Sequence, residues 1–271
     1  MDIIHPLDRY LRTDRLPHIW CPGCGIGIVI SAMLRAIDRH ISEGHFTQDD
    51  VATVSGIGCT ARATLYLNFD SAHVIHGRAI PFAIGLKVIK PNLKVIVIGG
   101  DGDIAAIGGN HLLHSARRNM DITVIMVNNM VYGMTGGQVA PTTPMKVYTT
   151  TTPYGNLEYP LNLIKLVSSL NTNYVARASV THPHLIERYI YNALSRDGFS
   201  FIEVISICPE VFGRHIGFRN PVELFNKLKS MIKFKAKPSI DESDIVWGKE
   251  IVLGEYVNEY KSGFIKLLYG S

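Results

Sequence analysis

The sequence predicts an α/β fold in which a mainly parallel sheet is flanked by helices. Strand-like and helix-like segments alternate through the middle of the chain, which is the rhythm of βαβ units. The segment at 93–100 is a continuous β-branched run, as expected of a strand that is covered on both faces. The 271 residues are 46% hydrophobic and 18% charged, so the chain can bury a sizeable core and is not globally disordered.

Each element follows from its local pattern and from the residues that end it. The run at 51–58 ends in glycines, and the run at 93–100 stops at an Asp-Gly-Asp turn. The helix expected after that turn closes with basic residues, which suit a helix C-terminus. In chain order we expect strands at 51–58, 93–100, 121–129, 174–178 and 201–206, and helices at 79–89, 104–119, 161–170, 184–195 and 221–232.

We divide the chain into a main domain at 1–215 and a short C-terminal extension at 216–271, which we expect to contact another subunit. The aperiodic stretch at 129–160 is long for a connection inside a domain, and such loops usually serve a function. No apolar run is long enough for a transmembrane helix, and the start lacks an apolar signal core, so we expect a cytoplasmic protein. The net charge is only +4 and the 27 basic residues are scattered along the chain, so we expect no nucleic-acid partner.

An acid–glycine turn and an asparagine pair follow consecutive strands. Gly99-Gly100-Asp101-Gly102-Asp103 ends one strand, and Asn128-Asn129 ends the next. A βαβ crossover brings both strand ends to the same rim of the sheet, where such folds bind ligands. Glycines let the backbone approach a phosphate. A carboxylate repels a diphosphate by about 4 kcal/mol per charge pair at ~4 Å and an effective dielectric of ~20, and Mg²⁺ reverses the sign of that interaction.

The simpler alternative is a Gly-Asp turn and an Asn cap that happen to close two strands. The spacing favours the diphosphate–metal site, because it resembles the thiamine diphosphate signature, in which GDG is followed after a helix by Asn. The resemblance implies that Mg²⁺ is held by Asp101, by Asn129 and by the main chain of Val131.

The cysteines are unevenly placed. Cys21 and Cys24 form a CxxC pair, whereas Cys59 and Cys208 are isolated and each follows a predicted strand. The pair alone is compatible with a zinc knuckle, a redox dithiol or a packed turn, and the isolated cysteines with small buried residues. Four thiolates arriving from different directions suit a cubane iron–sulfur cluster.

Taken together, the motifs resemble the β subunit of 2-oxoacid:ferredoxin oxidoreductases across residues 17–215. The motifs are WCPGCG, SGIGC, HGRA, GGDGD, NNxVYGMTGGQ and FSFIEVISICPE. TGGQVAPTTP and CPEVFGR look most like the 2-oxoglutarate branch. The resemblance implies a thiamine diphosphate-binding fold and a [4Fe–4S] cluster on Cys21, Cys24, Cys59 and Cys208.

The same resemblance implies CoA-dependent oxidative decarboxylation of a 2-oxoacid, with electrons passed through the cluster to ferredoxin. The activating glutamate is expected on a separate α subunit, so the isolated chain should be inactive; further small subunits are possible partners. We rank 2-oxoglutarate ahead of pyruvate and branched-chain 2-oxoacids. The alternatives are a non-redox thiamine-dependent decarboxylase or synthase subunit and a zinc-stabilised interaction subunit. The residues expected to bind the cofactor are Ile57, Gly58, Cys59, His76, Gly100, Asp101, Gly102, Asp103, Asn129, Val131, Met134 and Thr135.

Overall fold

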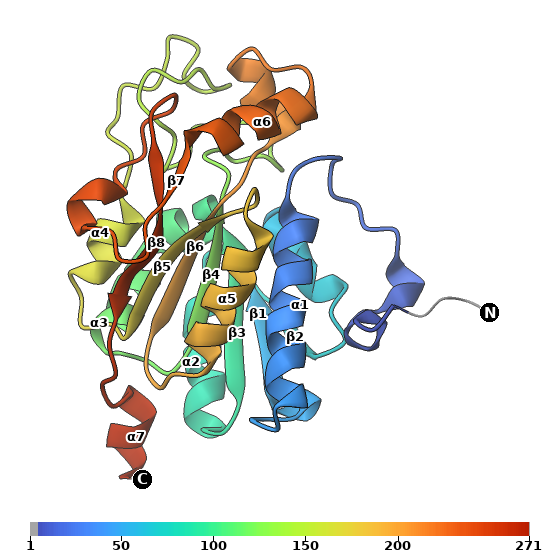
Figure 1. Ribbon diagram of the computed structural model, residues 1–271, viewed down its shortest axis with the longest axis vertical. Helices are drawn as coiled ribbons and strands as arrows, with labels where there is room; N and C mark the ends of the chain where they lie inside the picture. Colours follow the sequence, from blue (N-terminus) through green and yellow to red (C-terminus); the bar gives the residue numbers. More distant parts are fainter. Residues whose placement is uncertain (1–4, 271) are drawn as a thin grey trace.

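The computed structural model describes residues 5–270 and confirms the predicted fold class (Figure 1). One eight-stranded sheet has the order β2-β1-β3-β4-β6-β5-β8-β7. Neighbouring strands are parallel except β5 and β8, which are antiparallel. The strands are β1 (Val51–Ser55), β2 (Asp70–His73), β3 (Lys94–Gly100), β4 (Thr123–Asn128), β5 (Tyr174–Ser179), β6 (Ser200–Ile205), β7 (Ile232–Phe234) and β8 (Ile251–Asn258).

Helices cover both faces of this sheet. Figure 1 shows α1 and α5 in front of the strands, and these two helices share one hydrophobic core with alternate residues of β3 and β4, such as Ile96 and Ile125. The residues between them, such as Val97 and Val124, belong to a second core with α2, α3 and α4. The helices are α1 (Ile26–Ser42), α2 (Ala79–Ile89), α3 (Gly109–Arg117), α4 (Leu163–Ser168), α5 (Pro183–Leu194), α6 (Pro221–Met231) and α7 (Phe264–Tyr269).

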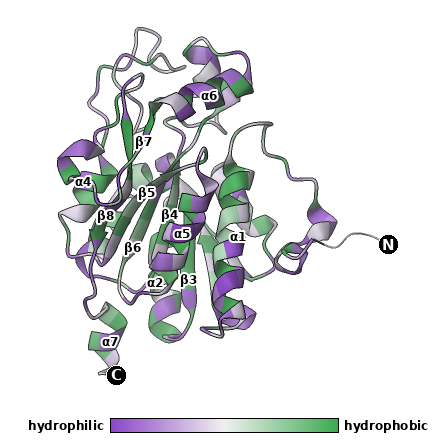
Figure 2. Cartoon of the chain, in the orientation of Figure 1, coloured by the Kyte–Doolittle hydropathy of each residue, from purple (hydrophilic) through white to green (hydrophobic). Residues whose placement is uncertain are grey.

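Burial on both faces explains why the central strands are mostly apolar. Every residue of β1, β4, β5 and β6 is buried. Figure 2 shows the same feature as green strands inside a shell of helices whose outward faces are purple. In α1 the face toward the sheet carries buried residues such as Val29, Met33 and Ile37.

The element that departs most from the prediction is the helix expected at 104–119. It is divided into a π-helical segment, Gly102–Ile107, and α3, which begins at Gly109. Gly108 lies between them, and a Cβ there would come 2.4 Å from the main-chain oxygen of Asp103, so that only glycine fits. Such π turns are frequent at functional sites, and this one follows the predicted diphosphate turn.

The described part of the C-terminal extension, residues 216–270, contributes two strands to the sheet. This segment contains α6, β7, β8 and α7, and β8 pairs with β5 from Tyr174↔Asn258 to Arg177↔Gly254. Its contact with another subunit stays a prediction. Among residues 5–270, no helix is both long enough and apolar enough to cross a membrane.

The topology brings the chemically important residues to one rim. β1, β3, β4 and β6 are consecutive neighbours in the sheet and run in the same direction. Asp101 and Asn129 come directly after β3 and β4, and Cys59 and Cys208 lie in the loops that follow β1 and β6. Ligands of open parallel sheets bind at this edge.

Candidate functional site

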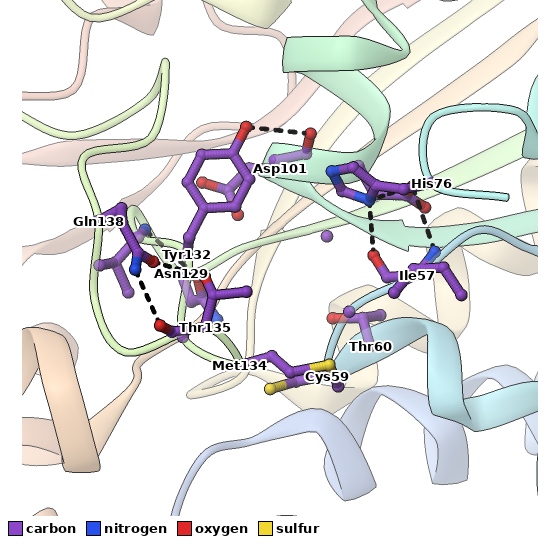
Figure 3. Close-up of a pocket in the computed structure, with 16 residues that line it drawn as sticks. Ile57, Cys59, Thr60, His76, Asp101, Asn129, Tyr132, Met134, Thr135 and Gln138 are labelled. Atoms are coloured by element: carbon purple, nitrogen blue, oxygen red, sulfur yellow. Dashed lines mark hydrogen bonds and ion pairs between the residues drawn. The ribbon is translucent and has the colours of Figure 1, made fainter.

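A cavity of about 530 Å³ opens at this rim (Figure 3). The structure brings all the residues predicted to bind the cofactor to its wall. Figure 3 shows Asp101 and Asn129 near Tyr132 on one side, with His76 and Ile57 on the other. The prediction missed Thr60, Tyr132, Gly133 and Gln138, which also line the cavity; each lies next to a predicted residue or inside a motif that was recognised.

Asp101 is one of two buried acidic residues that line the cavity. It is 2% exposed, and one of its carboxyl oxygens accepts a hydrogen bond from the hydroxyl of Thr142. Burial raises the pKa of Asp101 to about 7, because a carboxylate at this position loses its hydration. A divalent cation beside it would supply the missing compensation. Asn129 and Val131, the other predicted magnesium ligands, line the same cavity.

Two glycines, which have no side chain, form part of the cavity wall. A Cβ on Gly102 would come 2.2 Å from Cε1 of Tyr132, whose hydroxyl donates to the main-chain oxygen of Gly102 at 3.4 Å. Gly58 borders the cavity with φ of +145°, and a Cβ there would project into open space. Gly58 therefore leaves its backbone accessible to a bulky anion, whereas Gly102 leaves room for the ring of Tyr132 to pack against the turn.

The carboxyl group of Asp103 joins three loops. One of its oxygens accepts from the main-chain N–H of Gly77 at 2.6 Å and lies 3.0 Å from Nδ1 of His76. The same oxygen accepts a longer bond from the N–H of Ile57 at 3.4 Å. Its other oxygen is buried with no hydrogen-bond partner in the described part of the chain. Burial raises the pKa of Asp103. Asp103 therefore positions His76 and Ile57 on the cavity wall.

The mouth of the cavity is formed by the start of the aperiodic stretch at 129–160. Tyr132 and Gln138 form an isolated antiparallel bridge, and the side-chain amide of Gln138 donates to the main-chain oxygen of Thr135 at 2.8 Å. This small hairpin presents Met134 to the cavity. Met134 and Cys59 both line the cavity and are labelled in Figure 3.

The four cysteines are free thiols that converge beside this cavity. Cys59 lines the cavity itself. A Cβ on Gly133 would lie 3.3 Å from Sγ of Cys208 and 3.9 Å from Sγ of Cys59. Burial raises the pKa of Cys24 to about 11, and the neighbouring thiols Cys21, Cys208 and Cys59 raise it further. All the cysteines of the chain thus lie near one another, although they are far apart in the sequence.

The arrangement of these thiols bears on the kind of metal they suit. Within residues 5–270, no group of three or more His, Cys, Asp or Glu side chains is close enough together to hold a single metal ion. A single zinc ion draws its ligands tightly together. A four-iron cluster binds each thiolate to a different iron atom.

The comparisons with known proteins agree with this geometry. The family described as "Thiamine pyrophosphate enzyme, C-terminal TPP binding domain" matches residues 56–204; thiamine pyrophosphate is another name for thiamine diphosphate. This range contains the acid–glycine turn and the asparagine pair. The chain is therefore a thiamine diphosphate-binding protein.

Relatives in other organisms cover almost the whole chain. The 2-oxoglutarate synthase subunit KorB of Methanothermobacter thermautotrophicus is 49% identical over 94% of this chain and 87% of the relative. The protein of the same name from Methanocaldococcus jannaschii is 46% identical over 98% and 97%. The β subunit of 2-oxoacid:ferredoxin oxidoreductase 2 from Aeropyrum pernix is 40% identical over 70% of this chain and 60% of that protein.

A solved structure shares the fold. A chain of "2-oxoglutarate:ferredoxin oxidoreductase from Magnetococcus marinus with 2-oxoglutarate, coenzyme A and succinyl-CoA bound" superposes with a TM-score of 0.84 at 29% identity, covering 100% of this chain and 90% of that chain. Motifs, geometry and relatives converge, and the chain belongs to the family of β subunits of 2-oxoacid:ferredoxin oxidoreductases.

Proposed function

We propose that this chain is the thiamine diphosphate-binding β subunit of a cytoplasmic 2-oxoglutarate:ferredoxin oxidoreductase. The complex would convert 2-oxoglutarate and coenzyme A to succinyl-CoA and CO₂, and pass two electrons to ferredoxin. The observation that carries the proposal is that Cys59 lines the same cavity as the predicted diphosphate site, and that the other three thiols lie near Cys59. The names of the relatives favour 2-oxoglutarate over pyruvate and branched-chain acids.

The residues around the diphosphate turn fit magnesium and thiamine diphosphate. Oxygen atoms of Asp101, Asn129 and the main chain of Val131 would hold Mg²⁺, which prefers such hard ligands and keeps phosphate oxygens in its remaining positions. The buried carboxyl group of Asp101 fits this assignment, because a cation offsets the cost of its burial. When bound, the cofactor supplies an electron sink for cleavage at the 2-oxo carbon. Asp103 fixes the opposite wall through Gly77 and His76.

The thiols fit a [4Fe–4S] cluster that accepts electrons from the cavity. Cys21, Cys24, Cys59 and Cys208 supply the four thiolates that such a cluster requires. Burial raises the pKa of Cys24, Cys59 and Cys208, so these thiols would be protonated without a metal and deprotonated on binding iron. The indole N–H of Trp20 donates to the main-chain oxygen of Cys59 at 2.7 Å and fixes the Cys59 segment.

An α subunit would complete the site. The relatives are named as subunits of larger enzymes. Ile57, Ile75 and Phe82 are exposed beside the cavity, and contiguous apolar surface of this kind marks an interface. We assign to that partner the glutamate that activates the cofactor.

The direct test is to purify the complex anaerobically with its partner chain and to assay a panel of 2-oxoacids with coenzyme A and a low-potential electron acceptor. We expect the highest kcat/KM with 2-oxoglutarate. A preference for pyruvate would overturn the substrate assignment. A colourless, iron-free preparation that still decarboxylates a 2-oxoacid would favour the non-redox alternative.

The metal assignment is tested separately by Asp101→Ala. We expect this variant to lose thiamine diphosphate binding in calorimetry while keeping its iron, because Asp101 lies at the diphosphate turn and not among the thiols. Normal cofactor binding by the variant would show that Asp101 is not a magnesium ligand.

A further inference from the structure

The turn after β4 contains a residue in an unfavourable backbone conformation. Met130 lies between Asn129 and Val131, has φ of +63°, and is completely buried. The left-handed region is strained for a non-glycine residue, and such residues persist where the surrounding structure holds them. The groups that hold Met130 therefore also set the directions of the neighbouring Asn129 side chain and Val131 carbonyl.

Hydrogen bonds from two directions hold the main chain of Met130. Its N–H donates to Oδ1 of Asn128 at 3.1 Å, and its carbonyl oxygen accepts from the hydroxyl of Thr143 at 2.7 Å. Asn128 also lines a second cavity of about 310 Å³. The conformation of the turn consequently depends on these polar contacts as well as on packing.

The orientation of the Asn128 amide is itself imposed by a buried ion pair. Nδ2 of Asn128 donates to Oε1 of Glu203 at 2.8 Å, and Nε of Arg177 donates to Oε2 of Glu203 at 2.7 Å. A carboxylate only accepts hydrogen bonds, so it selects the NH₂ side of the Asn128 amide. The oxygen of Asn128 is then left to face the N–H of Met130.

This ion pair lies in the interior of the sheet. The side chains of Arg177 and Glu203 are 0% and 1% exposed. The two terminal nitrogens of Arg177 have no hydrogen-bond partner among the described residues. Burying charges in this way is costly, and apolar side chains of similar size often stabilise a fold as well or better. The burial of this ion pair is explained if Arg177 and Glu203 have a role besides stabilising the fold.

We propose that Arg177, Glu203 and Asn128 form a buried relay that positions the magnesium-binding turn. The arginine orients the glutamate, the glutamate fixes which way the amide of Asn128 faces, and the amide holds Met130 so that Asn129 and Val131 point into the cavity. These three are positioning residues and do not touch the metal. The inference rests on the proposed role of Asn129 and Val131 as magnesium ligands.

Glu203→Gln tests the relay with almost no change of shape. Because Arg177 can only donate, the oxygen of the new amide must face it, and its NH₂ group then faces Asn128. Asn128 can avoid this clash only by turning over, which directs its own NH₂ group at the N–H of Met130. In the purified complex we expect Mg²⁺ to bind 10- to 100-fold more weakly at saturating thiamine diphosphate, as is typical when groups that orient metal ligands are replaced.

The control is Asn119→Ala. Asn119 is also a buried asparagine, 5% exposed, and its side-chain oxygen accepts a hydrogen bond from the N–H of Phe199 at 2.8 Å. Unlike Asn128, it lies before the amino-terminal end of β4, away from the cavity at the carboxyl ends of the strands. We expect this variant to melt at a lower temperature and to keep the wild-type affinity for Mg²⁺. A purely structural role of Glu203 predicts the same result for Glu203→Gln.

The outcomes separate the relay from the proposed function. If the wild-type complex binds thiamine diphosphate equally well without Mg²⁺, the magnesium assignment itself is refuted. Magnesium-dependent binding in the wild type, with unchanged Mg²⁺ affinity in Glu203→Gln, would refute the relay alone. If Glu203→Gln does not fold, Asn128→Ser decides by the same criterion, because it leaves the Arg177–Glu203 pair intact.

Discussion

Replacing Asp101 by asparagine should stabilise the metal-free protein at neutral and alkaline pH. Burial raises the pKa of Asp101 from 3.8 to about 7, a difference worth about 4 kcal/mol at about 1.36 kcal/mol per pH unit. A carboxyl group whose pKa is higher in the folded chain binds a proton on folding, so stability falls as the pH rises from about 4 to about 7 and is lowest above pH 7. Asparagine carries no charge and can still accept the hydrogen bond from Thr142.

The stability gap between Asp101→Asn and wild type should therefore widen with pH. We expect the variant to be more stable by under about 2 kcal/mol at pH 5 and by up to about 4 kcal/mol at pH 8. Urea unfolding of both proteins in a chelating buffer, followed by circular dichroism, measures the gap, and groups that titrate alike in both proteins cancel. Mg²⁺ with thiamine diphosphate should reverse the order by stabilising the wild type alone. A gap that stays constant from pH 5 to pH 8 would refute the reasoning.

Three further substitutions test other parts of the site. Cys208→Ala should remove the cluster's iron while thiamine diphosphate still binds; unchanged iron content would exclude Cys208 as a ligand. Gly133→Ala places a Cβ 3.3 Å from Sγ of Cys208, and we expect it to lower iron content at least several-fold, measured against the Gly85→Ala control in α2, whose Cβ meets nothing within 4 Å. Asp103→Asn should weaken cofactor affinity about tenfold by loosening the Gly77 contact, equivalent to about 1.4 kcal/mol; equal affinity in calorimetry would contradict this.

The sequence predicted the parts of the fold whose patterns are local. The continuous apolar runs predicted the central strands, and α2 has the predicted limits, Ala79–Ile89. The edge strand β2 was missed because its residues are mostly exposed and carry no apolar pattern. β7 and β8 were missed because β8 is stabilised by pairing with β5, a contact between distant segments that no local pattern reports.

The site was predicted to the extent that its residues lie in motifs. Asp101 and Asn129 come directly after strands and Cys59 lies in the loop after β1, so the parallel topology brings all three to the same rim. The residues that orient them were not predicted. Thr142 reaches Asp101 from the aperiodic loop, and Glu203 reaches Asn128 from a neighbouring strand. Both contacts depend on the three-dimensional fold, and a buried Glu inside a strand looks like any other polar residue in the sequence.

The central claim is that thiamine diphosphate and an iron–sulfur cluster occupy adjoining parts of one cavity wall. The most direct measurement is anomalous diffraction at the iron edge from crystals of the anaerobic complex with the cofactor bound. We predict one iron peak surrounded by Cys21, Cys24, Cys59 and Cys208, next to cofactor density over the turn at Gly102. An anomalous peak at the zinc edge instead, or thiols with no metal between them, would contradict the claim.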